Sequence, residues 1–201
     1  MLPAPSLLLP APFVPLTAPH LIPPLSALLW LANCRKLLLE IQRHVTRPEL
    51  LLVSKNMGEE EAVQVFSLLQ RNSSASVLDV RGNGIGPSRD VTLALGGMIR
   101  HNTHILTLDL SSNDLGVRGA CAVSMGLQFN KTLKTLKMNC NRIRDDGAQA
   151  LAAAVTGNST LTSLHVCSNE LTDIGGAALV DAAQHSHSLE VLNLAGNQHE
   201  L

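Results

Sequence analysis

The sequence predicts an α/β solenoid, a curved array with short parallel strands on the inside and helices on the outside. Asparagine recurs along the chain at steps of 27, 30, 28, 28 and 28 residues. Apolar residues stand three and five positions before each of these asparagines, as in a strand that buries one face. Between the strands, apolar and small residues follow helical spacing. We therefore expect a horseshoe of about five to six repeats of about 28 residues.

The repeat unit reads L-x-x-L-x-L-x-x-N-x-L, and its asparagine has a structural part to play. The chain turns sharply after each strand, which leaves backbone N–H and C=O groups inside the array in need of partners. An amide side chain both donates and accepts hydrogen bonds, so it can join one turn to the next. We expect a ladder of six asparagines: Asn56, Asn83, Asn113, Asn141, Asn169 and Asn197.

This unit resembles the leucine-rich repeat, and its length is similar to that of the ribonuclease-inhibitor subfamily. The resemblance covers residues 48–201. Similar repeats occur in ribonuclease inhibitor, in the sensor portions of NOD-like receptors, in tropomodulins and in the Ran GTPase-activating protein. The resemblance implies a leucine-rich repeat solenoid, with parallel inner strands and outer helices, that binds proteins on its concave face.

The first 34 residues differ from the rest of the chain. They contain no Lys, Arg, Asp or Glu and hold eight of the ten prolines. The prolines interrupt every apolar span, and the positive start of a secretory signal is missing. We interpret residues 1–24 as a disordered Pro-rich apolar leader, with an unusual secretory or anchoring segment as the alternative. Helical spacing from Leu25 to Thr46 predicts a capping helix over residues 25–47.

Residues 48–201 form the repeat array. Carboxylates at Glu59–Glu61 and Asp145–Asp146 begin predicted helices, where they complement the helix dipole. No closing helix follows the last repeat, so we expect the array to lack a C-terminal cap and to be a truncated form or to self-associate through that edge. One predicted helix face, which recurs 28 residues earlier and later, consists of Ala148, Leu151, Ala152 and Val155.

Several motifs imitate functional sites, but the repeat accounts for them. The stretch RGNGIG from Arg81 to Gly86 lacks the pattern of a nucleotide loop. His185 and His187 have no third ligand at metal-site spacing. The glycosylation sequons at Asn72, Asn130 and Asn158 fall with Asn102 at helix ends, where we expect a left-handed backbone. We find no catalytic constellation, no metal site and no cofactor site, so the chain is not expected to be an enzyme.

Composition narrows the class of partner and the compartment. The formal net charge is −1, the pI is about 6.7 and aromatic residues make up 2% of the chain, which does not favour nucleic acid. The four cysteines form no CxxC pair and no zinc pattern. Free thiols are typical of a reducing compartment, so we expect the cytoplasm or the nucleus rather than secretion.

The outward residues of the strands form the inner surface of a solenoid, where partners usually bind. Along this surface acidic positions give way to basic ones, a mixture that favours a protein partner, whose identity the sequence does not give. The candidate binding residues are Asp79, Arg81, Asp109, Lys137, Asn139, His165 and Asn193.

The sequence thus predicts a noncatalytic adaptor or scaffold that binds a protein on the concave strand face. The alternative is a GTPase-activating protein resembling the Ran GTPase activator, in which polar and basic residues after the strands meet a nucleotide-bound partner. The basic candidates for that role are Arg81, Arg142 and Arg144.

Overall fold

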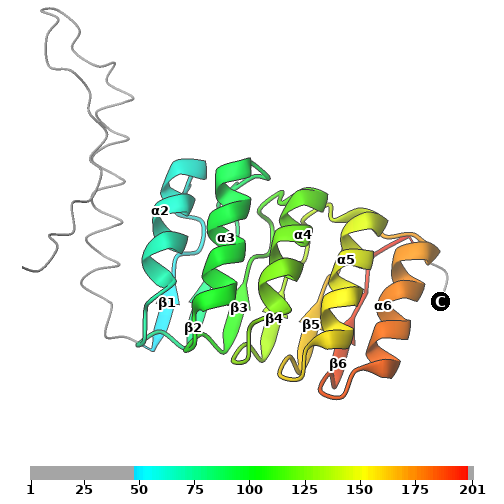
Figure 1. Ribbon diagram of the computed structural model, residues 1–201. Coiled ribbons are helices and arrows are strands. Elements are labelled where there is room, and N and C mark those ends of the chain that lie inside the picture. Colours follow the sequence, from blue (N-terminus) through cyan, green and yellow to red (C-terminus); the bar gives the residue numbers. More distant parts are fainter. Residues whose placement is uncertain (1–47, 199–201) are drawn as a thin grey trace, which may run out of the picture.

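The computed structural model describes residues 48–198, which form a curved array with the strands in one layer and the helices in the other (Figure 1). The six strands are parallel and lie side by side in chain order. They are β1 (Glu49–Leu51), β2 (Val77–Asp79), β3 (Thr107–Asp109), β4 (Thr135–Lys137), β5 (Ser163–His165) and β6 (Val191–Asn193). The helices are α2 (Glu59–Leu69), α3 (Arg89–His101), α4 (Gly116–Leu127), α5 (Arg144–Gly157) and α6 (Asp173–His185). The leader and capping helix expected over residues 1–47 lie outside the described residues.

The core is a stack of leucines that runs along the array between the two layers. Leu78, Leu108, Leu136 and Leu164 face one another in register on successive strands and are buried. The helix face expected from Ala148, Leu151, Ala152 and Val155 is buried as well. Each fully buried leucine contributes about 2 kcal/mol. The solenoid fold expected from the sequence is confirmed.

Glycines allow neighbouring helices to approach closely, most clearly between α3 and α4. A Cβ atom at Gly126 would lie 2.7 Å from the Gly96 carbonyl oxygen and 2.8 Å from the Ile99 Cβ. A Cβ atom at Gly96 would lie 2.9 Å from the Ala122 carbonyl oxygen. No side chain fits at such distances, so the spacing of these two helices depends on Gly96 and Gly126.

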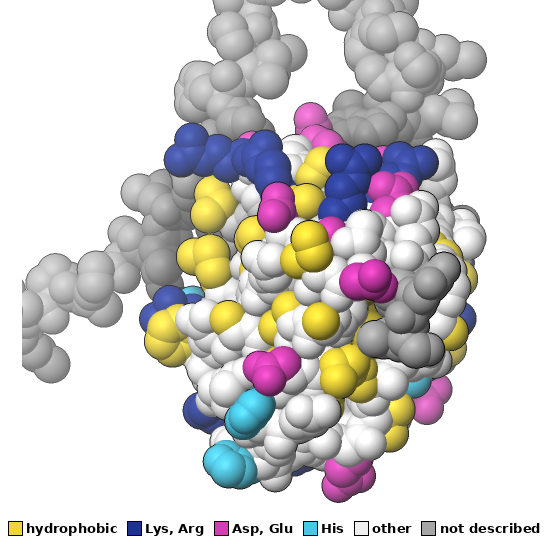
Figure 2. Space-filling view, turned by 90° about the vertical axis from the view of Figure 1, so that its right-hand side faces the viewer, with side chains coloured by type: hydrophobic (Ala, Val, Ile, Leu, Met, Phe, Trp, Pro, Cys, Tyr) yellow, Lys and Arg dark blue, Asp and Glu magenta, His cyan; other side chains and the backbone are white. Residues whose placement is uncertain are grey.

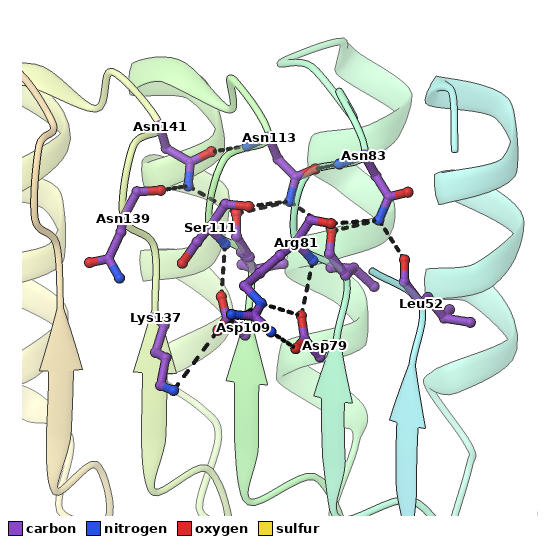
Figure 3. A network of polar contacts seen from close by, with 12 residues as sticks. Leu52, Asp79, Arg81, Asn83, Asp109, Ser111, Asn113, Lys137, Asn139 and Asn141 are labelled. Carbon is purple, nitrogen blue, oxygen red and sulfur yellow. Dashed lines mark hydrogen bonds and ion pairs between the residues drawn. The ribbon is translucent and has the colours of Figure 1, made fainter. Parts of the chain in front are cut away.

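The asparagine ladder runs through the turns after the strands (Figure 3). The Asn113 amide donates hydrogen bonds to the carbonyls of Val80 (3.0 Å) and Leu110 (2.9 Å), and its oxygen accepts one from the Asn83 backbone N–H (2.9 Å). Each amide thus satisfies backbone groups of its own repeat and of the preceding one. The same bond joins Asn141 to Asn113, Asn169 to Asn141 and Asn197 to Asn169.

Asn56 is not part of this ladder, and its assignment from the sequence was wrong. Leu50 pairs in register with Leu78, which places Lys55, 28 residues before Asn83, at the ladder position. The Lys55 backbone N–H donates to the Asn83 side-chain oxygen (2.8 Å), and Asn56 is exposed. The run Leu50–Val53 offers two alternating apolar sets. The structure buries Leu50 and Leu52 rather than the set taken from the sequence.

A second asparagine ladder lies at the opposite edge, where the helices end. The Asn130 amide donates to the carbonyls of Ile99 (2.6 Å) and Asn102 (3.1 Å), and its oxygen accepts from the Leu133 N–H (2.7 Å). Asn102 and Asn158 make equivalent bonds. The expectation of a left-handed backbone at these positions was wrong, because the backbone at Asn102 and Asn158 is extended (φ −73° and −93°). The amides act by bridging repeats, not by adopting an unusual backbone.

The second ladder also determines whether the sequons at Asn130 and Asn158 can be glycosylated in the folded chain. Both side chains are buried, and each amide nitrogen is committed to two carbonyls. A glycan cannot be attached to either nitrogen in the folded chain without breaking these bonds.

Candidate protein-binding surface

The candidate residues lie on the concave sheet face because the strands are parallel and in register. Asp79, Asp109, Lys137, His165 and Asn193 occupy equivalent positions on β2 to β6, each facing the next. Adjacent strands are about 4.8 Å apart, so these side chains form one continuous row. The sequence prediction of a shared row is confirmed in geometry; a binding role for it stays a prediction.

Four of the candidates come together as an ion-pair cluster (Figure 3). Arg81 contacts the Asp79 carboxylate through Nη2 (2.8 Å) and Nε (3.0 Å), and its Nε lies 3.6 Å from Asp109 Oδ2. Lys137 Nζ lies 3.9 Å from the same Asp109 oxygen. We call Asp79, Arg81, Asp109 and Lys137 the charged cluster. Its two carboxylates and two cations are balanced in charge.

Burial divides the charged cluster into a hidden acidic part and an exposed basic part. The Asp79 and Asp109 side chains are 11% and 8% exposed, whereas those of Arg81 and Lys137 are 50% and 40% exposed. Hydrogen bonding and charge from Asp79, then charge from Asp109, raise the pKa of Arg81 above its already high ordinary value. The surface therefore presents N–H donors to solvent above neutralised carboxylates.

The two aspartates also hold the backbone of their own turns, a role that the sequence reasoning missed. Asp79 Oδ1 accepts from the Arg81 N–H (3.1 Å), and Asp109 Oδ1 accepts from the Ser111 N–H (3.0 Å). Asn193 makes the same bond to the Ala195 N–H (3.1 Å). Asp and Asn favour such bonds to the N–H two residues later. The recurrence of Asp or Asn at this one position of the repeat was the feature of the sequence that could have predicted these bonds.

The remaining candidates occupy the other half of the face and do not join the charged cluster. The His165 ring nitrogen Nε2 lies 2.9 Å from the Ser163 hydroxyl, and Asn139 Oδ1 accepts from the Cys167 N–H (2.9 Å). These side chains are polar and partly buried. The concave face is therefore charged on β2 to β4 and mainly polar on β5 and β6.

Beside the charged cluster lies a hydroxyl that the sequence did not single out. Ser111 stands in the next repeat at the position of Arg81 and is buried. Its Oγ has no hydrogen-bond partner among the described residues. A buried hydroxyl without a partner costs about 1–3 kcal/mol. An incoming polar group at this point would recover part of that cost.

The edge where the strands end carries a second set of ion pairs, and Lys and Arg side chains gather along the top of Figure 2, where this edge lies. Arg142 contacts Asp114 (3.0 Å) and Glu170 (3.7 Å), and Arg144 contacts Glu170 (3.0 Å). These four residues have positive φ and are exposed. All three arginines considered for a GTPase activator are thus paired with carboxylates of this chain, and the geometry does not favour that alternative.

Within residues 48–198, neither a metal centre nor a membrane-spanning helix is found. No group of three His, Cys, Asp or Glu side chains in this part of the chain is arranged to hold a metal ion. No helix in the same range has the length and apolar character needed to span a bilayer.

Comparisons with known proteins agree with the repeat architecture. The Leucine Rich repeat family matches residues 101–124, 129–152 and 157–180, with starts 28 residues apart. Leiomodin-3 of Homo sapiens is 29% identical over 79 residues, which are 39% of this chain and 14% of leiomodin-3. Leiomodin-3 of Mus musculus is 28% identical over the same shares. The chain thus matches only a small part of these relatives.

A solved structure extends the likeness to most of the described array. It is that of leiomodin-1 actin-binding site 2, with a TM-score of 0.62 and 18% identity, covering 75% of this chain and 87% of that one. At this identity the likeness concerns the fold. The matched repeats, the parallel strand-and-helix array and the asparagine ladder agree with one another, and the chain is therefore a leucine-rich repeat protein.

Proposed function

We propose that this chain is a noncatalytic adaptor or scaffold that binds another protein on its concave face, with the charged cluster as the centre of the contact. The observation that carries the proposal is the unequal burial within that cluster. Asp79 and Asp109 are hidden and hold Arg81 in place, while the outer faces of Arg81 and Lys137 remain open. A rigid guanidinium that is fixed before binding loses little entropy when a partner arrives.

The chemistry of this surface suits carboxylates and carbonyl groups of a folded protein. A guanidinium binds carboxylates in a two-point geometry, and arginine is enriched at protein interfaces. The polar half of the face, with Asn139, His165 and Asn193, supplies further donors and acceptors. The cluster is neutral as a whole, which gives it little attraction for the continuous charge of nucleic acid. A protein partner is therefore the better fit.

Actin is the partner to test first. The solved structure of similar fold is titled an actin-binding site of leiomodin-1, and leiomodin-3 is similar in sequence over 79 residues. These likenesses suggest the partner. The 28-residue period supports a repeat array of the ribonuclease-inhibitor type. The cysteines, which show no disulfide or zinc pattern, support a location in the cytoplasm or nucleus.

The experiment is a titration of fluorescently labelled actin, as monomer and as filament, with the full chain. Arg81→Ser and Lys137→Asn introduce residues found at the equivalent positions Ser111 and Asn193. We expect the double variant to weaken binding by about tenfold or more. Arg142→Ser with Arg144→Ser, at the strand-end edge, is the control and should bind as the original chain does. If the chain binds neither form of actin, actin is not its partner. If all three chains bind equally well, the concave face is not the binding surface.

A further inference from the structure

The outer surface of the helix layer contains an apolar groove between α3 and α4 that the concave-face proposal does not use. It has a volume of about 470 Å³. Leu93, Met125 and Phe129 line it and are 64%, 68% and 53% exposed. Gly96 and Gly126 form its floor, because the close approach of the two helices excludes side chains there. Large apolar side chains gathered in one exposed hollow mark interaction sites.

The internal repeat provides a control for this groove within the same molecule. One repeat later, Met125 corresponds to Ala153 and Phe129 to Gly157. Two repeats later, the corresponding residues are Asp181 and His185. The repeat architecture therefore requires no large apolar side chain at these exposed positions, and folding gains little from one. Met125 and Phe129 thus depart from the small or polar residues that occupy the equivalent positions of the next two repeats.

Two arginines give the groove a charge preference. Arg100 and Arg118 both line it, and Arg100 lies over the Phe129 ring, 4.1 Å from its centroid. Neither has an ion-pair partner within residues 48–198. This differs from Arg81, Arg142 and Arg144, which are all paired. Among residues 48–198, no acidic residue lines the groove.

We propose that the α3–α4 groove binds an acidic amphipathic segment of another protein. Apolar side chains of that segment enter between Leu93, Met125 and Phe129, and its carboxylates meet Arg100 and Arg118. An amphipathic helix laid in a groove between helices is a recurrent mode of recognition. Residues 1–34 of this chain are apolar but contain no Asp or Glu, so they cannot supply the carboxylates.

The test uses a fluorescein-labelled helical peptide of about 18 residues built from Leu, Ala and Glu, and a sister peptide with Lys in place of every Glu. Fluorescence anisotropy with the full chain should show binding of the Glu peptide and at least about tenfold weaker binding of the Lys peptide. Met125→Ala with Phe129→Ala should weaken the Glu peptide by about tenfold or more. Arg100→Gln, which introduces the residue found at Gln128, should reduce the preference for Glu over Lys.

Ile174→Ala is the matched control, since Ile174 is an equally exposed apolar residue (63%) outside the groove. It should leave binding of the Glu peptide unchanged, and circular dichroism should show the same helix content in all variants. Equal binding of the Glu and Lys peptides, or equal loss in Ile174→Ala and the groove variant, overturns the proposal. Tighter binding of a peptide of residues 1–34 than of the Glu peptide overturns the assignment to a second protein. The concave-face variants leave these results unaffected, so the two proposals fail independently.

Discussion

Asp79 of β2 and Asp109 of β3 face each other in the sheet register and share the guanidinium of a single residue, Arg81. Neighbouring strands of a sheet are about 4.8 Å apart. Carboxylates that face each other across such a pair of strands repel unless a cation lies between them. Arg81 neutralises the pair and stays half exposed. The same side chain thus stabilises the concave face, and its exposed half is the part that we propose meets a partner.

Replacement of Arg81 should reveal this repulsion. We expect Arg81→Ser to lower the midpoint of thermal unfolding by roughly 1–3 °C at low salt, because exposed ion pairs contribute little individually. The difference from the original chain should shrink at about 0.5 M NaCl, where charges are screened within a few ångströms. Differential scanning fluorimetry at two salt concentrations measures it. A loss that does not depend on salt would mean that Arg81 acts through packing instead.

Asn113 and Asn56 form a matched pair for the ladder. Asn113→Ala removes the side-chain acceptor of the buried Asn83 N–H. It also removes one of the two amide donors to each of the Val80 and Leu110 carbonyls, which keep Asn83 and Asn141 as donors. We expect it to reduce the free energy of unfolding by about 3 kcal/mol or more. Asn56→Gly, at an exposed position outside the ladder where the backbone is left-handed (φ 53°), should change it by less than about 0.5 kcal/mol. Urea denaturation measures both, and equal effects would contradict the register.

The second ladder can be tested with a residue that the chain itself uses. Ser186 stands 28 residues after Asn158, and its hydroxyl accepts from the N–H groups of Ser188 and Leu189. Asn158→Ser should keep these acceptor bonds but lose both amide donors to the carbonyls of Leu127 and Asn130. We expect a loss of about 1–3 kcal/mol in urea denaturation. A neutral result would show that the amide donors do not hold neighbouring repeats together.

Asp145 joins two helices and makes stability depend on pH. Its carboxylate, in the first turn of α5, accepts hydrogen bonds from the Thr172 hydroxyl (2.7 Å) and N–H (2.9 Å) and the Gly175 N–H (3.0 Å) at the start of α6. The Thr172 hydroxyl is the largest cause of a lowered pKa for Asp145. A lowered pKa means that the stabilisation is fully present above the unfolded value of about 3.9 and is lost as pH falls through the folded value.

We therefore expect Asp145→Ala to cost about 0.5–1 kcal/mol near neutral pH, allowing for the exposure of the group. The difference from the original chain should diminish below about pH 4 and vanish at lower pH. Asp146→Ala, in the same turn but without these contacts, is the control. Urea denaturation at a series of pH values measures the curve. A difference that grows as the pH falls would have the wrong sign for this account.

The sequence was sufficient to predict the fold because the same pattern of residues occurs in several successive repeats. The ladder positions from Asn83 to Asn197 and the buried helix face around Leu151 were all read from fixed offsets. The first repeat was misread because the run from Leu50 to Val53 is apolar at every position, so alternation alone gives two possible registers. Only pairing with β2 selects Leu50 and Leu52.

The candidate site was predictable in position but not in character. The row from Asp79 to Asn193 follows from the register of the strands. The low exposure of Asp79 and Asp109, in contrast, goes with the contacts that Arg81 makes to both carboxylates across two strands, and the sequence pattern does not contain these contacts. The groove at Met125 and Phe129 was not predicted, because one apolar residue on a helix carries no information about its neighbours. Comparison of equivalent positions, with Ala153 and Gly157 one repeat later, contains the signal.

The most direct test of the central claim, that the concave face binds a protein, is a quantitative affinity purification from cell extract. It compares the full chain with Arg81→Ser/Lys137→Asn and with the edge control Arg142→Ser/Arg144→Ser. The account predicts at least one protein that is retained by the original chain and the control but lost, by about tenfold, from the concave variant. Recovery of the same proteins in the same amounts by all three chains would contradict it.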